Sequence, residues 1–224
     1  MQRIIVSDES KGIEIAKKKI YEFVDQKTVL FLSGGKTPFN LYQKFASEKI
    51  LKPGSVAMVD ERYFTSEELR TNNEKLNSTN GKMIKDTGFL SYLESENIPF
   101  YGTLKNKPLE ETARDYDETI RYLLKSFPKS IAILGVGKDK HTASLLEDWV
   151  PSKDEENLLV TQLKDFPGEF KERTTLTLFG LSMIDLLLVL VFGEDKKGVI
   201  KSPPSFFRRE NISNKTLLIT DQKL

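Results

Sequence analysis

Residues 28–38 read TVLFLSGGKTP, and their pattern indicates the fold class. Its first part, residues 28–32, is an apolar run of the length expected for a buried strand. Two glycines then permit a tight turn, and Thr37 and Pro38 supply an N-cap and a first-turn proline for a helix that continues through residues 41–45. A buried strand that turns directly into a helix predicts an α/β fold.

The same alternation of apolar runs and helical patterns continues along the chain. Short apolar runs predict strands at residues 55–59, 130–134, 158–161, 174–178, 186–192 and 216–220. We expect helices at residues 13–24, 112–124 and 195–201, and a surface loop containing a helix at the polar residues 65–87. Strands separated by helices imply parallel pairing. We therefore expect an α/β fold with an open, mostly parallel, Rossmann-like sheet flanked by helices, in one domain over residues 1–224.

The composition excludes several classes of function. The chain has 34 basic and 33 acidic residues, so no bulk charge favours nucleic acid. It has no cysteine and one histidine, which argues against disulfides, thiolate catalysis and a zinc site, and we expect no metal. Residues 186–192 are too few to span a membrane, which takes about 20 residues, and residues 1–9 have no signal-like apolar run. We expect a cytoplasmic protein with no nucleic acid or membrane partner; the sequence carries no signal for the number of subunits.

Four polar clusters each follow a predicted strand directly. They begin at Ser33, Asp60, Gly135 and Gly193. Ligands of parallel α/β sheets bind beyond the carboxyl ends of the strands. We therefore expect these clusters to converge on one rim of the sheet.

The first cluster, Ser33-Gly34-Gly35-Lys36-Thr37, has the chemistry of a phosphate site. Glycines let the backbone approach a ligand closely, and a helix N-terminus offers unpaired amides. An ordinary strand-to-helix turn is the alternative. The glycine-to-lysine spacing is not that of a Walker A loop, and no GxGxxG pattern follows a strand, which disfavours dinucleotide binding. Arg173 and Lys196 flank predicted strands and either complete a phosphate site or are surface charges.

The other clusters carry groups for acid–base and electrostatic catalysis. Asp60, Glu61 and Arg62, two carboxylates and a guanidinium at a strand end, could hold a hydroxyl-rich ligand or stabilise developing charge, or belong to a surface ion-pair group. The lone histidine, His141, lies in a glycine-rich loop after a predicted strand. Asp139 is placed to orient its ring, and Lys140 favours the neutral imidazole that a general base needs.

Separated segments of the chain, taken in order, resemble one family. Residues 33–38 (SGGKTP) resemble its SGGxTP loop, and residues 59–62 (VDER) its (V/T)DER segment. Residues 134–145 (LGVGKDKHTASL) resemble its LGxGxDGHTASL signature, and residues 173–177 (RTTLT) with 193–196 (GEDK) its RxTLT and GxxK elements. The family is 6-phosphogluconolactonase, and glucosamine-6-phosphate deaminase is its structural relative.

This resemblance implies an activity and assigns roles to residues. The activity is hydrolysis of 6-phospho-D-glucono-1,5-lactone to 6-phosphogluconate in the oxidative pentose phosphate pathway, without a cofactor. The implied catalytic residues are His141 as the general base, Asp139 as its orienting partner, Arg62 as the stabiliser of charge at the carbonyl, and Asp60. The implied phosphate-binding residues are Ser33, Gly34, Gly35, Lys36, Thr37, Arg173 and Lys196.

The sequence departs from the family pattern at two places near the histidine. Lys140 stands where the family has glycine, and Leu146-Glu147 replaces Phe-Pro. Two alternatives to the lactonase follow. The first is a deaminase or isomerase of an amino-sugar phosphate, which requires Glu147 to reach the site. The second is a sugar-phosphate-binding protein that has lost catalysis through the change at Lys140.

Overall fold

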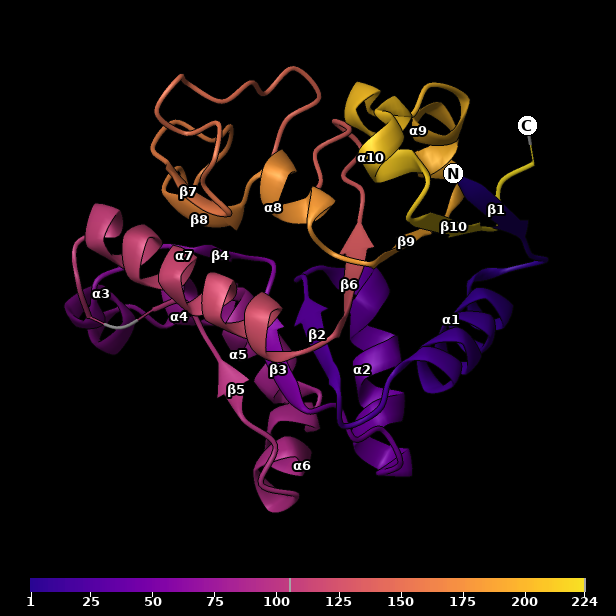
Figure 1. Cartoon of the computed structure of the whole chain (residues 1–224), viewed down its shortest axis with the longest axis horizontal. Helices are drawn as coiled ribbons and strands as arrows, with labels where there is room; N and C mark the ends of the chain where they lie inside the picture. The colour runs from indigo at the N-terminus through magenta and orange to yellow at the C-terminus, as the bar shows by residue number, and fades with distance from the viewer. Residues whose placement is uncertain (105, 224) are drawn as a thin grey trace.

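The main sheet of the structure, a computed structural model that describes residues 1–104 and 106–223, contains parallel strands only (Figure 1). In spatial order its seven strands within the described residues are β1 (Gln2–Ile5), β10 (Thr216–Thr220), β9 (Leu186–Val191), β6 (Lys129–Gly135), β2 (Thr28–Leu32), β3 (Ser55–Met58) and β5 (Phe100–Tyr101). Every residue of β2, β3 and β10 is buried, as expected for strands covered on both faces. The predicted α/β fold with a mostly parallel sheet is confirmed.

Helices flank this sheet. The longer ones are α1 (Glu9–Phe23), α2 (Lys36–Glu48) and α7 (Leu109–Ser126). The shorter ones are α3 (Ser66–Thr71), α4 (Asn73–Ser78), α5 (Asn80–Asp86), α6 (Phe89–Ser95), α8 (Leu178–Ser182), α9 (Lys197–Lys201) and α10 (Glu210–Ser213), with 3₁₀ turns η1 (Glu194–Lys196) and η2 (Ser205–Arg208). The polar residues 65–87 thus contain three short helices instead of one.

The start of α2 differs from the sequence prediction. The N-cap is Gly35, not Thr37, and the helix begins at Lys36. Gly35 has a φ of +106°, a conformation open to glycine, so the chain turns into the helix before it reaches the threonine. The helix therefore exposes its first unpaired amides directly after the glycines, at Lys36 and Thr37.

A second, smaller sheet is antiparallel. Its strands are β4 (Asp60–Arg62), β8 (Arg173–Leu176) and β7 (Val160–Leu163). The expectation of parallel pairing is wrong for residues 158–161 and 174–178, because no helix separates β7 from β8 and the chain returns directly. Residues 177–178 leave the strand, since Thr177 caps α8. Helix α7 packs against β7 and β8.

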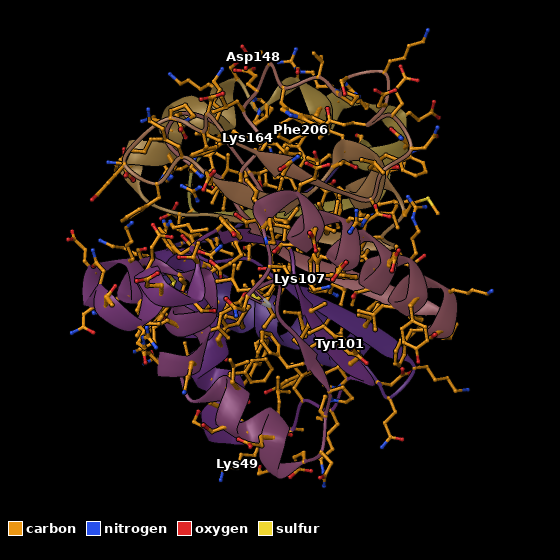
Figure 2. All side chains as sticks on the ribbon, turned by 90° about the vertical axis from the view of Figure 1, so that its left-hand side faces the viewer. Lys49, Tyr101, Lys107, Asp148, Lys164 and Phe206 are labelled. Carbon is orange, nitrogen blue, oxygen red and sulfur yellow. The ribbon has the colours of Figure 1, made fainter. Side chains whose placement is uncertain are left out.

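The carboxyl ends of the main strands face the part of the molecule that holds the small sheet and the C-terminal helices. In Figure 1 the arrowhead of β6 points toward the region of α8, α9 and α10. Figure 2 shows Asp148, which follows β6 in the chain, at one end of the molecule, and Lys49, the C-cap of α2, at the other. The loops after β2 and β6 therefore meet between the main sheet and this upper region.

Candidate active site

A cleft with a volume of about 560 Å³ lies at this meeting point. All predicted site residues except Asp139 line it, and so do Gly135 and Gly193, so the polar clusters converge as predicted. A larger and more open depression of about 870 Å³ runs between α1 and α2, but it is lined by none of the predicted residues. Chemistry is expected in the smaller cleft, because ligands of parallel sheets bind where the strands end.

The loop between β2 and α2 presents backbone to the cleft. Tyr42 donates a hydrogen bond to the carbonyl oxygen of Ser33 (2.9 Å) and fixes the end of the strand. A Cβ atom at Gly34 would lie 2.0 Å from Oδ1 of Asn80, so this position has no room for a side chain. The side-chain oxygen of Ser33 is buried and has no hydrogen-bond partner among the described residues. The amide of Gly35 donates only to the sulfur of Met83 (3.2 Å), a weak acceptor. First-turn amides of a helix and a hydroxyl without a partner suit an anionic ligand.

The small sheet turns two arginines toward the same cleft. Arg62 of β4 lies opposite Arg173 of β8 in the antiparallel register, so both side chains share one face. Burial, followed by the charge of Arg62, lowers the pKa of Arg173 to about 10. Within residues 1–104 and 106–223, neither guanidinium forms a salt bridge. The charges of Asp60 and Glu61 oppose the lowering of the Arg173 pKa only in part. Two adjacent cations without a salt bridge favour a ligand with more than one negative charge.

Each arginine is held by its neighbours. Arg62 donates from Nη1 to the carbonyl oxygen of Ser78 and lies 5.6 Å from the ring centroid of Phe170. Arg173 donates from Nε to the carbonyl oxygen of Phe170 (3.0 Å) and stacks 4.3 Å from the ring centroid of Phe166. These contacts orient both side chains before any ligand arrives.

The carboxylates of β4 bond to neighbouring segments, and Asp60 also lines the cleft. Asp60 is buried and accepts a hydrogen bond from the hydroxyl of Ser144 (2.6 Å), which ties the loop after β6 to the small sheet. Glu61 accepts from the backbone amides of Arg62, Asn80 and Gly81, each at 2.7 Å, and so holds the N-terminus of α5 against β4. Burial raises the pKa of Glu61 to about 7, although the three amides oppose this rise.

His141 lies in a tight turn after β6. The amide of Gly137 donates to the carbonyl oxygen of His141 (2.7 Å), and the amide of Lys140 donates back to Gly137 (3.0 Å). Lys140 has a φ of +67°, and Ala143 and Ser144 also have positive φ values, of +52° and +54°. Non-glycine residues in this conformation are uncommon and gather at functional sites.

The ring of His141 pairs with Asp139. Nδ1 of His141 lies 2.5 Å from Oδ1 of Asp139, and a Cβ atom at Gly137 would clash with both groups. Partial burial acts to raise the pKa of Asp139, but the charge and hydrogen bonds of His141 outweigh it, and the pKa is lowered. The carboxylate favours the tautomer with the proton on Nδ1, which leaves the Nε2 lone pair for a ligand. Phe166 packs against the ring edge-on, 5.3 Å between centroids.

Lys196 completes the cleft from the turn after β9. Its Nζ donates to the carbonyl oxygen of Val136 (2.7 Å), and burial lowers its pKa below the ordinary value. Lys138 and Asp195 form an ion pair at 2.9 Å beside it. Lys36 lines the cleft as an exposed side chain at the start of α2.

Sequence reasoning did not single out several residues that shape the cleft. Asn80 fits against Gly34, Ser144 bonds Asp60, and Phe166 contacts both His141 and Arg173. Asn80 belongs to a stretch interpreted as a surface loop, and no periodicity distinguishes Phe166. Among the described residues no group of acidic or histidine side chains could hold a metal ion, and no helix there has the length and apolarity to cross a membrane.

Comparisons with known proteins agree on one family. Residues 11–207 match the family model described as glucosamine-6-phosphate isomerases/6-phosphogluconolactonase. The 6-phosphogluconolactonase of Thermotoga maritima is 30% identical over 190 residues, which cover 82% of this chain and 79% of that protein.

Solved structures share the fold. A 6-phosphogluconolactonase from Plasmodium vivax superposes with a TM-score of 0.75 at 22% identity, over 99% of this chain and 91% of that one. A monomeric glucosamine-6-phosphate deaminase gives a TM-score of 0.67 at 17% identity, over 98% and 97%. Because a lactonase and a deaminase both match at low identity, these likenesses show the fold alone.

Proposed function

We infer that this chain, which belongs to the family of glucosamine-6-phosphate isomerases and 6-phosphogluconolactonases, hydrolyses 6-phospho-D-glucono-1,5-lactone to 6-phosphogluconate in the oxidative pentose phosphate pathway. The relative from Thermotoga maritima is named for this activity. The observation that carries the proposal is the pairing of His141 with Asp139 at 2.5 Å beside a cleft lined by two guanidinium groups that form no salt bridge within the described residues. Lactone hydrolysis needs a base, an oxyanion stabiliser and an anchor for the distal phosphate.

His141 acts as the general base. Its Nε2 removes a proton from water while the water oxygen attacks the lactone carbonyl carbon. Asp139 holds the ring and stabilises the imidazolium that forms. When the tetrahedral intermediate collapses, the bond from this carbon to the ring oxygen breaks, and the imidazolium returns its proton to that oxygen. The net reaction adds one water, and the product carboxylic acid then ionises.

Arg62 stabilises the developing oxyanion. Its position on the small sheet beside Arg173 lets one guanidinium face the carbonyl while the other faces the phosphate. Asp60 serves the reaction by holding Ser144 and hence the His141 loop, so we treat it as a positioning residue. Preorganised charge of this kind is a large source of catalysis.

The phosphate is held by backbone and cations together. The amides of Gly34, Lys36 and Thr37 lie at the start of α2, and Arg173 and Lys196 add positive charge. The amide of Gly35 donates to the sulfur of Met83 (3.2 Å) and would exchange this partner for a phosphate oxygen. The hydroxyl of Ser33 is free to donate to a phosphate oxygen. This anchor fixes the distance between the carbonyl carbon and His141.

The two alternatives are less well supported. A deaminase would need Glu147 in the cleft, but Glu147 bonds Lys140 at 2.9 Å and does not line the cleft. A protein that lost catalysis through Lys140 would be expected to have a distorted loop. Instead Lys140 takes the left-handed turn, and the His141–Asp139 pair is intact.

We further propose that residues 1–224 act as one domain in the cytoplasm. One cluster of buried side chains includes Leu30 of the main sheet and Leu176 of the small sheet. A chain with no cysteine fits a reducing compartment.

The test is hydrolysis of freshly prepared 6-phosphogluconolactone, corrected for spontaneous ring opening, by the wild type and His141→Ala. We expect acceleration by the wild type and a loss of about a hundredfold or more in the variant. A wild type that binds 6-phosphogluconate without turnover would indicate a binding protein. Release of ammonia from glucosamine 6-phosphate would indicate a deaminase.

A further inference from the structure

The turn that carries His141 has a lysine in a conformation that favours glycine. Lys140 has a φ of +67°, directly before the proposed base. A non-glycine residue keeps this conformation only when surrounding contacts hold it there. The backbone bonds between Gly137 and residues 140–141 close the turn, but they do not distinguish lysine from glycine. Contacts of the Lys140 side chain must therefore explain why a lysine keeps this conformation.

The side chain of Lys140 bridges to two other segments. Its Nζ lies 2.9 Å from Oε2 of Glu147 and 3.4 Å from the hydroxyl of Ser202. The carbonyl oxygen of Glu147 in turn accepts a hydrogen bond from the hydroxyl of Ser205 (3.2 Å). Both ends of the 140–147 loop are thus joined to residues 202–205.

The segment that Lys140 and Glu147 contact also contains Lys196. Residues 194–205 begin with η1, whose last residue, Lys196, bonds the carbonyl oxygen of Val136. The Lys140 contacts are a further connection between the loop of His141 and this segment, and they start at the residue next to the histidine. They join the half of the cleft that carries the base to the half that carries a phosphate-binding lysine.

We propose that Lys140 and Glu147 are positioning residues: their ion pair holds the left-handed turn and fixes His141 relative to Lys196. The inference rests on the proposed lactone hydrolysis. It also accounts for two departures from the family pattern together, since lysine in place of glycine and glutamate in place of proline contact one another. An ordinary surface ion pair would leave turnover unchanged, and partial exposure of the two side chains (28% and 38%) makes that the alternative to exclude.

The first experiment is a double-mutant cycle on kcat and KM with Lys140→Ala, Glu147→Ala and the double variant. We expect each single variant to lower kcat by about two- to fivefold with little change in KM, and the double variant to be no worse than the singles. The charge-swapped pair K140E/E147K should recover part of the loss. Lys52→Ala is the control, because Lys52 forms an ion pair with Glu96 at 2.6 Å and neither residue lines the cleft. Single variants that retain wild-type kcat would overturn the proposal.

Lys140→Gly separates positioning from stability. Glycine relieves the left-handed backbone but lacks the tether, so we expect a melting temperature at or above that of the wild type together with a reduced kcat. If the side chain of Lys140 only stabilised the fold, kcat of Lys140→Gly would instead change in the same direction as its melting temperature. Wild-type kcat in Lys140→Gly would overturn the proposal.

Amide hydrogen exchange tests the tether without any turnover. Lys140→Ala should speed exchange in residues 137–145 and 194–202, and Lys52→Ala should not. A wild type without lactonase activity would refute the proposed function, while the exchange rates would still decide whether the tether exists. Unchanged exchange in both segments would refute the tether.

Discussion

The two loops that line the cleft after the neighbouring strands β2 and β6 obtain their shapes by different means. The loop at residues 33–37 uses glycine where a side chain would clash or where φ is +106°. The loop at residues 137–145 places Lys140, Ala143 and Ser144 in the same left-handed region. The second loop also contains a glycine, Gly137, that has no room for a side chain, and backbone bonds close its turn. The first loop is therefore shaped by its backbone alone, and the second by its backbone together with side-chain contacts to other elements.

The difference indicates how each loop should respond to mutation. A phosphate-binding loop that offers amides needs no side chain, so the addition of a methyl group is the damaging change. A loop that must aim one imidazole needs partners, so the removal of a contact is the damaging change. Four variants follow, ordered by the size of the effect that we expect. Asp139→Asn and Gly34→Ala test the two loops directly, and Arg173→Met and Glu61→Gln test the small sheet that lies beside them.

Asp139→Asn should have the largest effect, on kcat. An asparagine amide that donates to Nδ1 would move the ring proton to Nε2, the nitrogen that must accept a proton from water. We expect kcat to fall by about a hundredfold, measured by lactone hydrolysis, with the fold unchanged by circular dichroism. Asp86→Asn, which alters a surface pair with Lys82, is the control. A loss below about threefold would contradict the orientation role.

Arg173→Met should act on KM more than on kcat. Methionine keeps much of the apolar contact with Phe166 but removes the charge opposite Arg62. We expect KM to rise by about tenfold or more, measured by initial rates over a range of lactone concentrations. Arg208→Met on η2 is the control. A change confined to kcat would place the phosphate elsewhere.

Gly34→Ala tests the loop shaped by backbone. The new methyl group would meet the side chain of Asn80, which must move, so we expect a loss of about 1–3 kcal/mol in the free energy of unfolding. Affinity for 6-phosphogluconate should weaken as well. Gly198→Ala in α9 meets no atom within 4 Å and should be neutral or slightly stabilising. Denaturant titration and calorimetry measure both, and equal stability of the two variants would undo the contrast between the loops.

Glu61→Gln should have the smallest effect on catalysis, because Glu61 does not line the cleft. The substitution replaces one of the two acceptor oxygens with a donor, which lowers stability at every pH, and it also removes a pH dependence of stability. The folded-state pKa of Glu61 is raised from 4.5 to about 7, so the folded state binds more protons than the unfolded state between these values. The free energy of unfolding therefore falls as pH rises through this window. Between pH 4.5 and 7, the free energy of unfolding of the variant should therefore rise relative to that of the wild type by on the order of 1 kcal/mol. Urea titrations at several pH values measure this difference. Glu67→Gln, at an exposed position of α3, should show no such gain.

Sequence patterns predicted the parts of the fold that are local and buried. The run at residues 216–220 matches β10 to the residue, because β10 is buried throughout and reads as one apolar element. Strand β1 is an edge strand with exposed ends, and β5 has two residues, so neither produces a distinct run. The pairing of β4 with β8 joins segments far apart in the chain, which no local pattern reports.

The site shows the same division. The sequence placed the predicted residues near one cleft correctly, because residues that directly follow parallel strands lie at the same edge of the sheet. The contacts that fix their geometry are long-range: Ser144 and Asp60 are 84 residues apart, and Asn80 reaches Gly34 from another helix. The sequence identified Lys140 and Glu147 as two separate departures, and only the fold makes them partners.

The register that sets Arg62 opposite Arg173 has a thermodynamic consequence. Like charges directly across a strand pair destabilise the empty protein, and a bound dianion removes that repulsion. A ligand that binds only the folded state stabilises it by mass action, by about 2.7 kcal/mol at a hundred times its dissociation constant. Phosphorylated sugars should therefore raise the melting temperature, while their unphosphorylated counterparts should not. The size of the shift then ranks anionic ligands by their affinity for the cleft.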